Sequence, residues 1–154
     1  MRAERVLPAG AWDAAHEVDQ VLADYDHRHR RRLVLMTQSG RSLLLDLPHA
    51  VRLRNGDGLE TEAGIVRVCA RPEALLEIAA PDPRGLARLA WHLGNRHLPV
   101  QFAGAHIRIL ADHVIEDMLR GLGASIERIE APFDPEAGAY SGLHHHQHDR
   151  RDDD

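Results

Sequence analysis

The stretch PDPRGLARLAWHLG, residues 81–94, decides the fold of the C-terminal half of this sequence. Asp82 is a residue type that caps helix N-termini, and Pro83 follows it at the first helical position, where a missing N–H costs nothing. The apolar residues that come next recur at helical spacing and form one stripe: Leu86, Leu89, Ala90 and Leu93. The stretch therefore predicts an amphipathic helix that ends at Gly94-Asn95, a pair tolerant of the left-handed conformation.

Strand signals surround this helix, and a second helix follows it. Residues 75–79 precede it, and residues 100–102 and 105–110 flank a turn at Ala103-Gly104, which indicates a hairpin. Asp112 then caps a helix that runs toward Gly123, and residues 125–131 form a last strand. The order strand, helix, strand, strand, helix, strand is typical of a ferredoxin-like fold.

The sequence before Arg71-Pro72 has a different rhythm. Short β-favouring runs at residues 33–36, 42–47 and 64–70 are separated by turn signals at Ser39-Gly40, Pro48 and residues 55–58. This spacing predicts a small antiparallel β domain. We therefore predict an α+β protein with three parts: a β-rich domain at residues 1–71, a ferredoxin-like domain at 72–140, and a flexible His-rich tail at 141–154.

Composition narrows the classes of function. The chain has 154 residues, 44% of them hydrophobic, and a net charge of −5 with histidine neutral, which argues against a generic nucleic-acid or anionic-membrane binder. No apolar run approaches the ~20 residues that a membrane helix needs, and no export signal opens the sequence. A single cysteine, Cys69, excludes an internal disulfide and favours a reducing compartment, the cytoplasm. No catalytic or phosphate-binding motif is present, so we expect a carrier and not an enzyme.

Histidine is the outlier of the composition, with 12 residues in the chain. Four lie close to the end: His144, His145, His146 and His148. Neutral imidazoles on a flexible segment suit nickel, copper and zinc, so metal binding is the preferred interpretation. A purification tag is the alternative, but Gln147 interrupts the run and a charged segment follows it.

A second candidate ligand is His97, which follows the first helix. By itself it would be a surface or capping histidine. The residues around it resemble the signature stretch of the UreE-type urease accessory family: WHLGNRHLPVQ at residues 91–101. Two further blocks agree with that family in order and spacing: DHVIEDML at 112–119 and PFDPEAGAY at 132–140. Three ordered blocks are far more specific than one.

The resemblance implies a nickel metallochaperone for urease maturation. It implies that His97 binds Ni²⁺ at a homodimer interface, one imidazole from each protomer, while the tail histidines add ligands. Histidine ligands alone do not name the metal, so Zn²⁺ and Cu²⁺ are possible competitors. It also implies transfer to the urease accessory GTPase and the apo-urease accessory complex, with GTP hydrolysis supplied by that partner. The N-terminal half is similar, more loosely, to a peptide-binding domain of Hsp40-type chaperones.

Other histidines are weaker candidates. His113 and His92 are secondary metal candidates, although Ala111 stands where certain relatives have a further histidine, and His106 is weaker still. His16 and His49 are structural by default. A basic cluster contains His27, His29, Arg30, Arg31 and Arg32 and could contact an acidic partner or nucleic acid, but a solvated loop is the commoner explanation.

Two functions of other classes remain open at this point. In the first, the protein is a metal buffer or storage protein whose tail binds ions without specific transfer. In the second, it is a peptide-binding co-chaperone whose histidines are incidental. Specific binding of the GTPase separates the chaperone from the buffer, and binding of unfolded peptide by the N-terminal half tests the co-chaperone.

Overall fold

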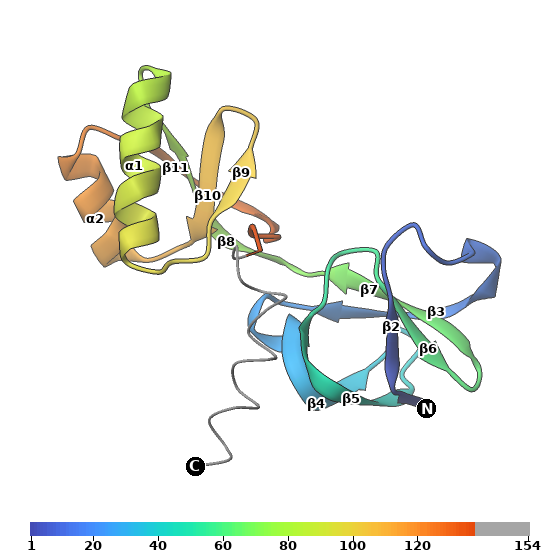
Figure 1. The fold of residues 1–154 in the computed structure, drawn as a ribbon. Coiled ribbons are helices and arrows are strands. Elements are labelled where there is room, and N and C mark those ends of the chain that lie inside the picture. Colours follow the sequence, from blue (N-terminus) through green and yellow to red (C-terminus); the bar gives the residue numbers. More distant parts are fainter. Residues whose placement is uncertain (138–154) are drawn as a thin grey trace, which may run out of the picture.

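The computed structural model describes residues 1–137, which form two halves joined by an extended connection (Figure 1). The predicted tail, residues 141–154 with His144, His145, His146 and His148, lies outside the described residues. None of the helices within residues 1–137 has the length and apolar character that crossing a membrane requires.

The C-terminal half has the predicted order of elements. They are β8 (Pro72–Ala79), α1 (Pro83–Asn95), β9 (Gln101–Ala103), β10 (His106–Leu110), α2 (His113–Gly121) and β11 (Ser125–Pro132). The strands pair in the order β11-β8-β10-β9, every neighbour antiparallel, and both helices cover one face of the sheet (Figure 1). The ferredoxin-like prediction is confirmed, including the β9–β10 hairpin.

Apolar residues of the helices fill the space above this sheet. Leu89 and Leu93 of α1 are buried, and Leu86 and Ala90 pack partly buried against the same core. Ile107 and Ile109 of β10 meet them from the sheet because alternate strand residues share a face. The helical stripe read from the sequence is therefore the face that holds α1 on the sheet.

The helix N-termini follow their capping residues. The Asp82 carboxylate accepts a hydrogen bond from the Gly85 N–H at 2.6 Å. The Asp112 carboxylate accepts from Val114 and Ile115 at 2.9 and 3.1 Å. Each side chain satisfies donors that a helix leaves without intrahelical partners, so both predicted starts are confirmed.

Helix α1 ends at Asn95, as predicted, but its left-handed residue lies farther along the chain than expected. The left-handed residue is His97, with φ of 58°, and not Gly94 or Asn95. The His97 N–H bonds to the Gly94 carbonyl at 3.0 Å and the Leu98 N–H to the Leu93 carbonyl at 3.3 Å, the two bonds of a Schellman motif. Leu98 also packs against the core that contains Leu93, the hydrophobic contact that commonly accompanies this motif.

The N-terminal half is built from two sheets around a separate core. Its strands are β1 (Arg2–Ala3), β2 (Arg5–Leu7), β3 (Glu17–Ala23), β4 (His29–Met36), β5 (Ser42–Arg52), β6 (Gly58–Thr61) and β7 (Gly64–Ala70). One sheet has the order β1-β5-β4 and the other β2-β6-β7-β3. Leu43 and Leu45 from the first sheet and Val66 and Val68 from the second belong to one buried cluster.

Two details of the predicted β domain are wrong. The domain is not purely antiparallel, because β1 pairs with β5 and β3 with β7 in parallel. The chain between each pair is long enough for the crossover that parallel strands need. Pro48 does not end a strand but lies exposed inside β5, near a register shift between Arg30 and Arg32 of β4. Proline lacks the N–H of a regular ladder and is tolerated at such irregularities.

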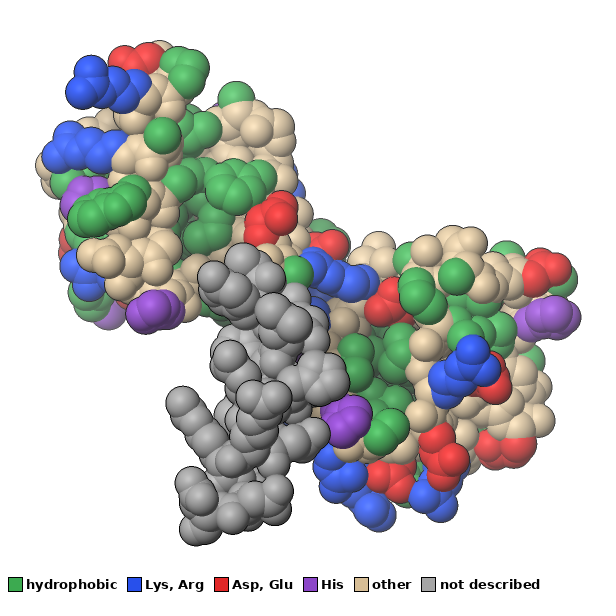
Figure 2. Space-filling view, in the orientation of Figure 1, with side chains coloured by type: hydrophobic (Ala, Val, Ile, Leu, Met, Phe, Trp, Pro, Cys, Tyr) green, Lys and Arg blue, Asp and Glu red, His purple; other side chains and the backbone are tan. Residues whose placement is uncertain are grey.

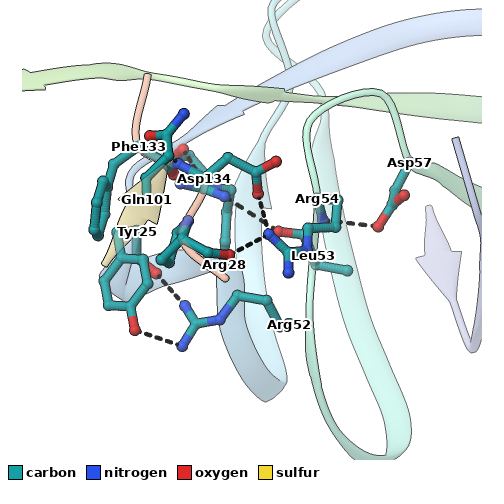
Figure 3. Close-up of polar contacts among 11 residues, drawn as sticks. Tyr25, Arg28, Arg52, Leu53, Arg54, Asp57, Gln101, Phe133 and Asp134 are labelled. Carbon is teal, nitrogen blue, oxygen red and sulfur yellow. Dashed lines mark hydrogen bonds and ion pairs between the residues drawn. The ribbon is translucent and has the colours of Figure 1, made fainter. Parts of the chain in front are cut away.

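The two halves meet at residues 133–136, named here the seam segment. Phe133 is fully buried, with its ring centroid 5.2 Å from that of Tyr25, and its carbonyl accepts a hydrogen bond from Arg28. Arg28 is itself fully buried and also donates to the carbonyls of Ala23 and Leu53, each at 3.2 Å (Figure 3). The seam segment is therefore packed into the N-terminal half.

Contacts to the C-terminal half hold the other side of the seam segment. The Asp134 N–H donates to the Gln101 side chain at 3.1 Å, and the Glu136 N–H donates to the Val100 carbonyl at 2.8 Å. Arg54 bonds the Asp134 carboxylate at 2.6 Å and the Pro135 carbonyl at 2.5 Å from the N-terminal side (Figure 3). Both halves therefore form hydrogen bonds with the same four-residue segment.

We predict that Phe133→Ala lowers the free energy of unfolding by about 3–5 kcal/mol, because it leaves a cavity at the seam. The matched control is Phe102→Ala, since Phe102 is 53% exposed and has little burial to lose. Denaturant unfolding at equal protein concentrations measures both. Equal losses in the two variants would contradict the role of Phe133.

Candidate metal-binding site

The structure presents His97 as an exposed side chain at the C-terminal end of α1. Its backbone occupies the position of the Schellman motif that glycine usually takes. A non-glycine residue in this conformation costs on the order of 1 kcal/mol. The backbone alone would favour glycine here, so the imidazole is the feature that sets this residue apart.

His97 faces a cleft between the two halves. The cleft has a volume of about 1190 Å³, and His97 lines it together with Leu98 and Pro99. His29 of β4 and His49 of β5 line the opposite, N-terminal wall. Histidine side chains are visible on both halves in the space-filling view (Figure 2). Imidazoles from two separate cores therefore border one open space.

The described residues do not complete a metal site by themselves. Within residues 1–137, no three side chains of His, Cys, Asp or Glu lie close enough to hold a metal ion together. His92 is half-buried on α1, with its ring 5.0 Å from that of Trp91, and His113 is exposed at the first position of α2. Neither joins His97 in a described cluster, and His106 is exposed at the start of β10.

Glu116, in the second motif block, serves the fold. Its buried carboxylate accepts hydrogen bonds from Arg128 at 3.0 Å and Arg120 at 3.2 Å, and so ties α2 to β11. The bond from Arg128 is the main reason that the pKa of Glu116 lies below its usual value, outweighing the opposing effect of desolvation. This carboxylate is occupied by two guanidinium groups and is not a candidate metal ligand.

Sequence reasoning missed the position of His29 and His49. His49 was expected to be structural and His29 to belong to a basic cluster, whereas both line the cleft with His97. No local pattern could have indicated this, because 48 positions separate His49 from His97 and the seam segment brings their halves together. Long-range contacts between the halves, such as those of Arg28 and Arg54 with residues 133–135, carry that information.

Exposed imidazoles beside an open cleft, with no complete set of ligands among residues 1–137, are typical of a metal site that other groups complete, the class of site expected of a metal carrier. The comparisons with known proteins agree. Residues 73–154 match the sequence model of the UreE urease accessory protein, C-terminal domain, and residues 3–71 match that of its N-terminal domain.

Curated relatives cover nearly the whole chain. The urease accessory protein UreE of Bradyrhizobium sp. strain BTAi1 is 54% identical over 154 residues, which is 99% of this chain and 74% of the relative. That of Beijerinckia indica is 50% identical and covers 96% of this chain and 87% of the relative. The chain belongs to the UreE family of urease accessory proteins. Its function is the predicted one, nickel delivery for urease maturation, and the family is one of metallochaperones, not enzymes.

The positive φ of His97 predicts how substitutions at this position change the stability of the fold. His97→Gly and His97→Asn should keep the fold at least as stable as it is now, because glycine and asparagine tolerate positive φ. His97→Val should lower the free energy of unfolding by about 1–2 kcal/mol, because a β-branched residue is an outlier in this region. Thermal unfolding of the metal-free variants measures this, and a fully stable valine variant would show that the residue leaves the left-handed region without cost.

Proposed function

We propose that the chain carries Ni²⁺ on His97, paired with His97 of a second copy across the two-fold axis of a homodimer. The observation that carries the proposal is the exposed imidazole held in a glycine position at the end of α1. A single histidine beside a two-fold axis becomes two converging ligands without any further ligand in the sequence. His97 thereby gains a second imidazole, whereas residues 1–137 of one chain contain no group of three potential metal ligands.

The surface near His97 supports pairing of two copies. Trp91 of α1 is 63% exposed, and Val114 of α2 is exposed as well. A large aromatic side chain gains the most when an interface covers it, and Trp is enriched at the centres of interfaces. Trp91 lies on the same helix as the Schellman motif, so a dimer that buries this tryptophan brings the two copies of His97 near its axis.

A pair of imidazoles leaves coordination positions of the ion open. The tail histidines His144, His145, His146 and His148 would supply further ligands, and His113 and His92 are secondary candidates. Open positions let the ion pass to the ligands of a recipient. Nitrogen ligands alone do not select nickel, since copper binds such sites more tightly, so Zn²⁺ and Cu²⁺ would compete.

The partners and location follow from this proposal. The recipient would be the urease accessory GTPase together with the apo-urease accessory complex, which would supply the nucleotide hydrolysis. The cytoplasm, a reducing compartment, suits a chain whose one cysteine is Cys69. Each of the three parts would have its own task. The domain at residues 1–71 would bind partner proteins, the domain at 72–140 would hold the ion, and the segment at 141–154 would capture it first.

A second candidate function has an observation of its own. Val34 and Met36 of β4 are 63% and 66% exposed, and β4 is the edge strand of its sheet. An edge strand with apolar side chains at alternate positions is a surface on which an extended peptide could add. Weaker binding of unfolded peptides by Met36→Ser protein would support this co-chaperone function, and unchanged binding would count against it.

We predict that removing residues 143–154 lowers the number of bound nickel ions but leaves at least one site per dimer. Calorimetric nickel titration measures this, and His97→Asn in the shortened protein should then abolish the remaining site with the fold intact. If the shortened protein binds no nickel at all, the interfacial site is wrong. If His97→Asn leaves that site unchanged, storage on the tail becomes the better function.

The nickel affinity should also depend on pH. Imidazole binds metals only when neutral, and its unperturbed pKa is about 6.5, so affinity should fall as the pH drops through about 6. Competition with a chelator at a series of pH values gives the profile. An affinity that stays constant from about pH 8 to pH 5 would indicate carboxylate ligands such as Asp149 or Asp152.

A further inference from the structure

The N-terminal wall of the cleft presents an arginine that has no carboxylate partner within residues 1–137. Arg52 of β5 lines the cleft and donates hydrogen bonds to the Tyr25 carbonyl at 3.2 Å and the Tyr25 hydroxyl at 2.8 Å (Figure 3). Its guanidinium also lies over the Tyr25 ring, 4.0 Å from the centroid. The other N–H groups of Arg52 have no acceptor in this part of the chain. Arg52 is therefore a cation held in place with donors left for a ligand.

The charge around Arg52 is positive. The cleft-lining residues within 1–137 include one carboxylate, Glu136, and three arginines: Arg31, Arg52 and Arg54. Arg54 is paired with Asp134 at 2.6 Å, whereas the exposed Arg31 comes only within 3.8 Å of Asp46. Burial lowers the pKa of Arg52, and the charge of Arg54 acts in the same direction. Arg31 and Arg52 therefore offer positive charge to a ligand in the cleft.

The opposite wall of the cleft is apolar. Leu98, Pro99, Val100 and Phe102 line it from the C-terminal half. Phe102 of β9 is 53% exposed, and an aromatic ring gains much from being covered. Val51 of β5 is exposed in the same cleft on the arginine side. A ligand that fills the cleft therefore meets cations on one wall and an apolar surface on the other.

These two walls fit one class of ligand best. A cleft of about 1190 Å³ holds several side chains, so a small inorganic anion on the arginines would leave Phe102 uncovered. A nucleic acid or an anionic membrane would meet a chain with a net charge of −5, which provides no wide positive field. A short acidic peptide places carboxylates on the arginines and an apolar side chain on Phe102.

We propose that the cleft binds an extended acidic segment of a partner protein, with carboxylates on Arg52 and Arg31 and an apolar side chain against Phe102. The planar guanidinium matches a carboxylate with two parallel hydrogen bonds. Tyr25 already holds Arg52 in place, so binding costs little ordering of that side chain. The segment would lie beside His97, which also lines the cleft. Only the consequence of this position for nickel rests on the proposed function, whereas the docking itself does not.

The docking is tested on the full-length, metal-free protein with a fluorescein-labelled synthetic peptide in which glutamates flank one phenylalanine. Fluorescence anisotropy should show saturable binding at low ionic strength. The binding should weaken in about 1 M salt, where the Debye length is ~3 Å. Peptides with every glutamate replaced by glutamine, or with the phenylalanine replaced by alanine, should each bind severalfold more weakly. Equal binding of either replacement peptide would overturn the proposal.

Variants of the protein assign the binding to the two walls. Arg52→Gln should raise the Kd about tenfold or more, because a hydrogen bond to a charged group contributes ~1.5–3 kcal/mol. Arg31→Glu should raise it by a similar factor, because repulsion replaces attraction, and Phe102→Ala should raise it severalfold. Arg31 and Phe102 are exposed, so these two variants keep the fold even if Arg52→Gln does not. The matched control is Arg84→Glu, an exposed position on α1 that does not line the cleft. An equal effect of Arg84→Glu and Arg31→Glu would overturn the proposal.

Photo-crosslinking locates the peptide directly when benzoylphenylalanine replaces its phenylalanine. Mass spectrometry should find the crosslink on residues that line the cleft. Crosslinks confined to Val34 and Met36 would assign the peptide to the edge of β4 and overturn the proposal. Binding seen only after removal of residues 143–154, or only at concentrations where the protein is monomeric, would assign the cleft to this chain or to a second copy and would also overturn it. No nickel enters these measurements, so failure of the proposed function at His97 leaves their outcome unchanged.

Discussion

The buried guanidinium of Arg28 is the contact on which the arrangement of the two halves depends. Arg28 donates hydrogen bonds to the carbonyls of Ala23 and Leu53 in the N-terminal half. It also donates to the carbonyl of Phe133, which directly follows the last strand of the C-terminal half (Figure 3). Burial lowers the pKa of Arg28, while the charges of Asp134 and Glu73 act in the opposite direction. Burying a charge is costly, so such a contact is best understood as fixing one arrangement of parts and not as a source of stability.

That arrangement leaves His97 beside an open cleft and not inside a complete metal site. Arg28 and Arg54 fix the seam segment, so that the cleft between the two halves lies next to His97. A preformed site of three or more ligands would hold its ion tightly and release it slowly. Under the proposed function, the exposed imidazole of His97 would need a second copy of the chain to complete its site, and the ion would be released when that partner moved away.

Local chemistry decided the parts of the fold that the sequence predicted correctly. Asp82, Asp112 and the stripe of α1 act within a few residues of themselves, and they led directly to the ferredoxin-like half. The errors have two origins. Pro48 remains in β5 beside a register shift with the partner strand β4, a long-range effect. His97 takes the left-handed position expected of Gly94 or Asn95 through the local hydrogen bonds of a Schellman motif. His97 was found through family resemblance, whereas His29 and His49 reach the cleft only through packing of the halves.

The central claim is that the ion lies between two copies of His97. Anomalous diffraction at the nickel absorption edge, from crystals of the nickel-loaded full-length protein, tests it most directly. The account predicts a nickel peak on the two-fold axis of a dimer, within coordination distance of His97 from both protomers. Peaks confined to other histidines, with both copies of His97 unligated, would contradict it.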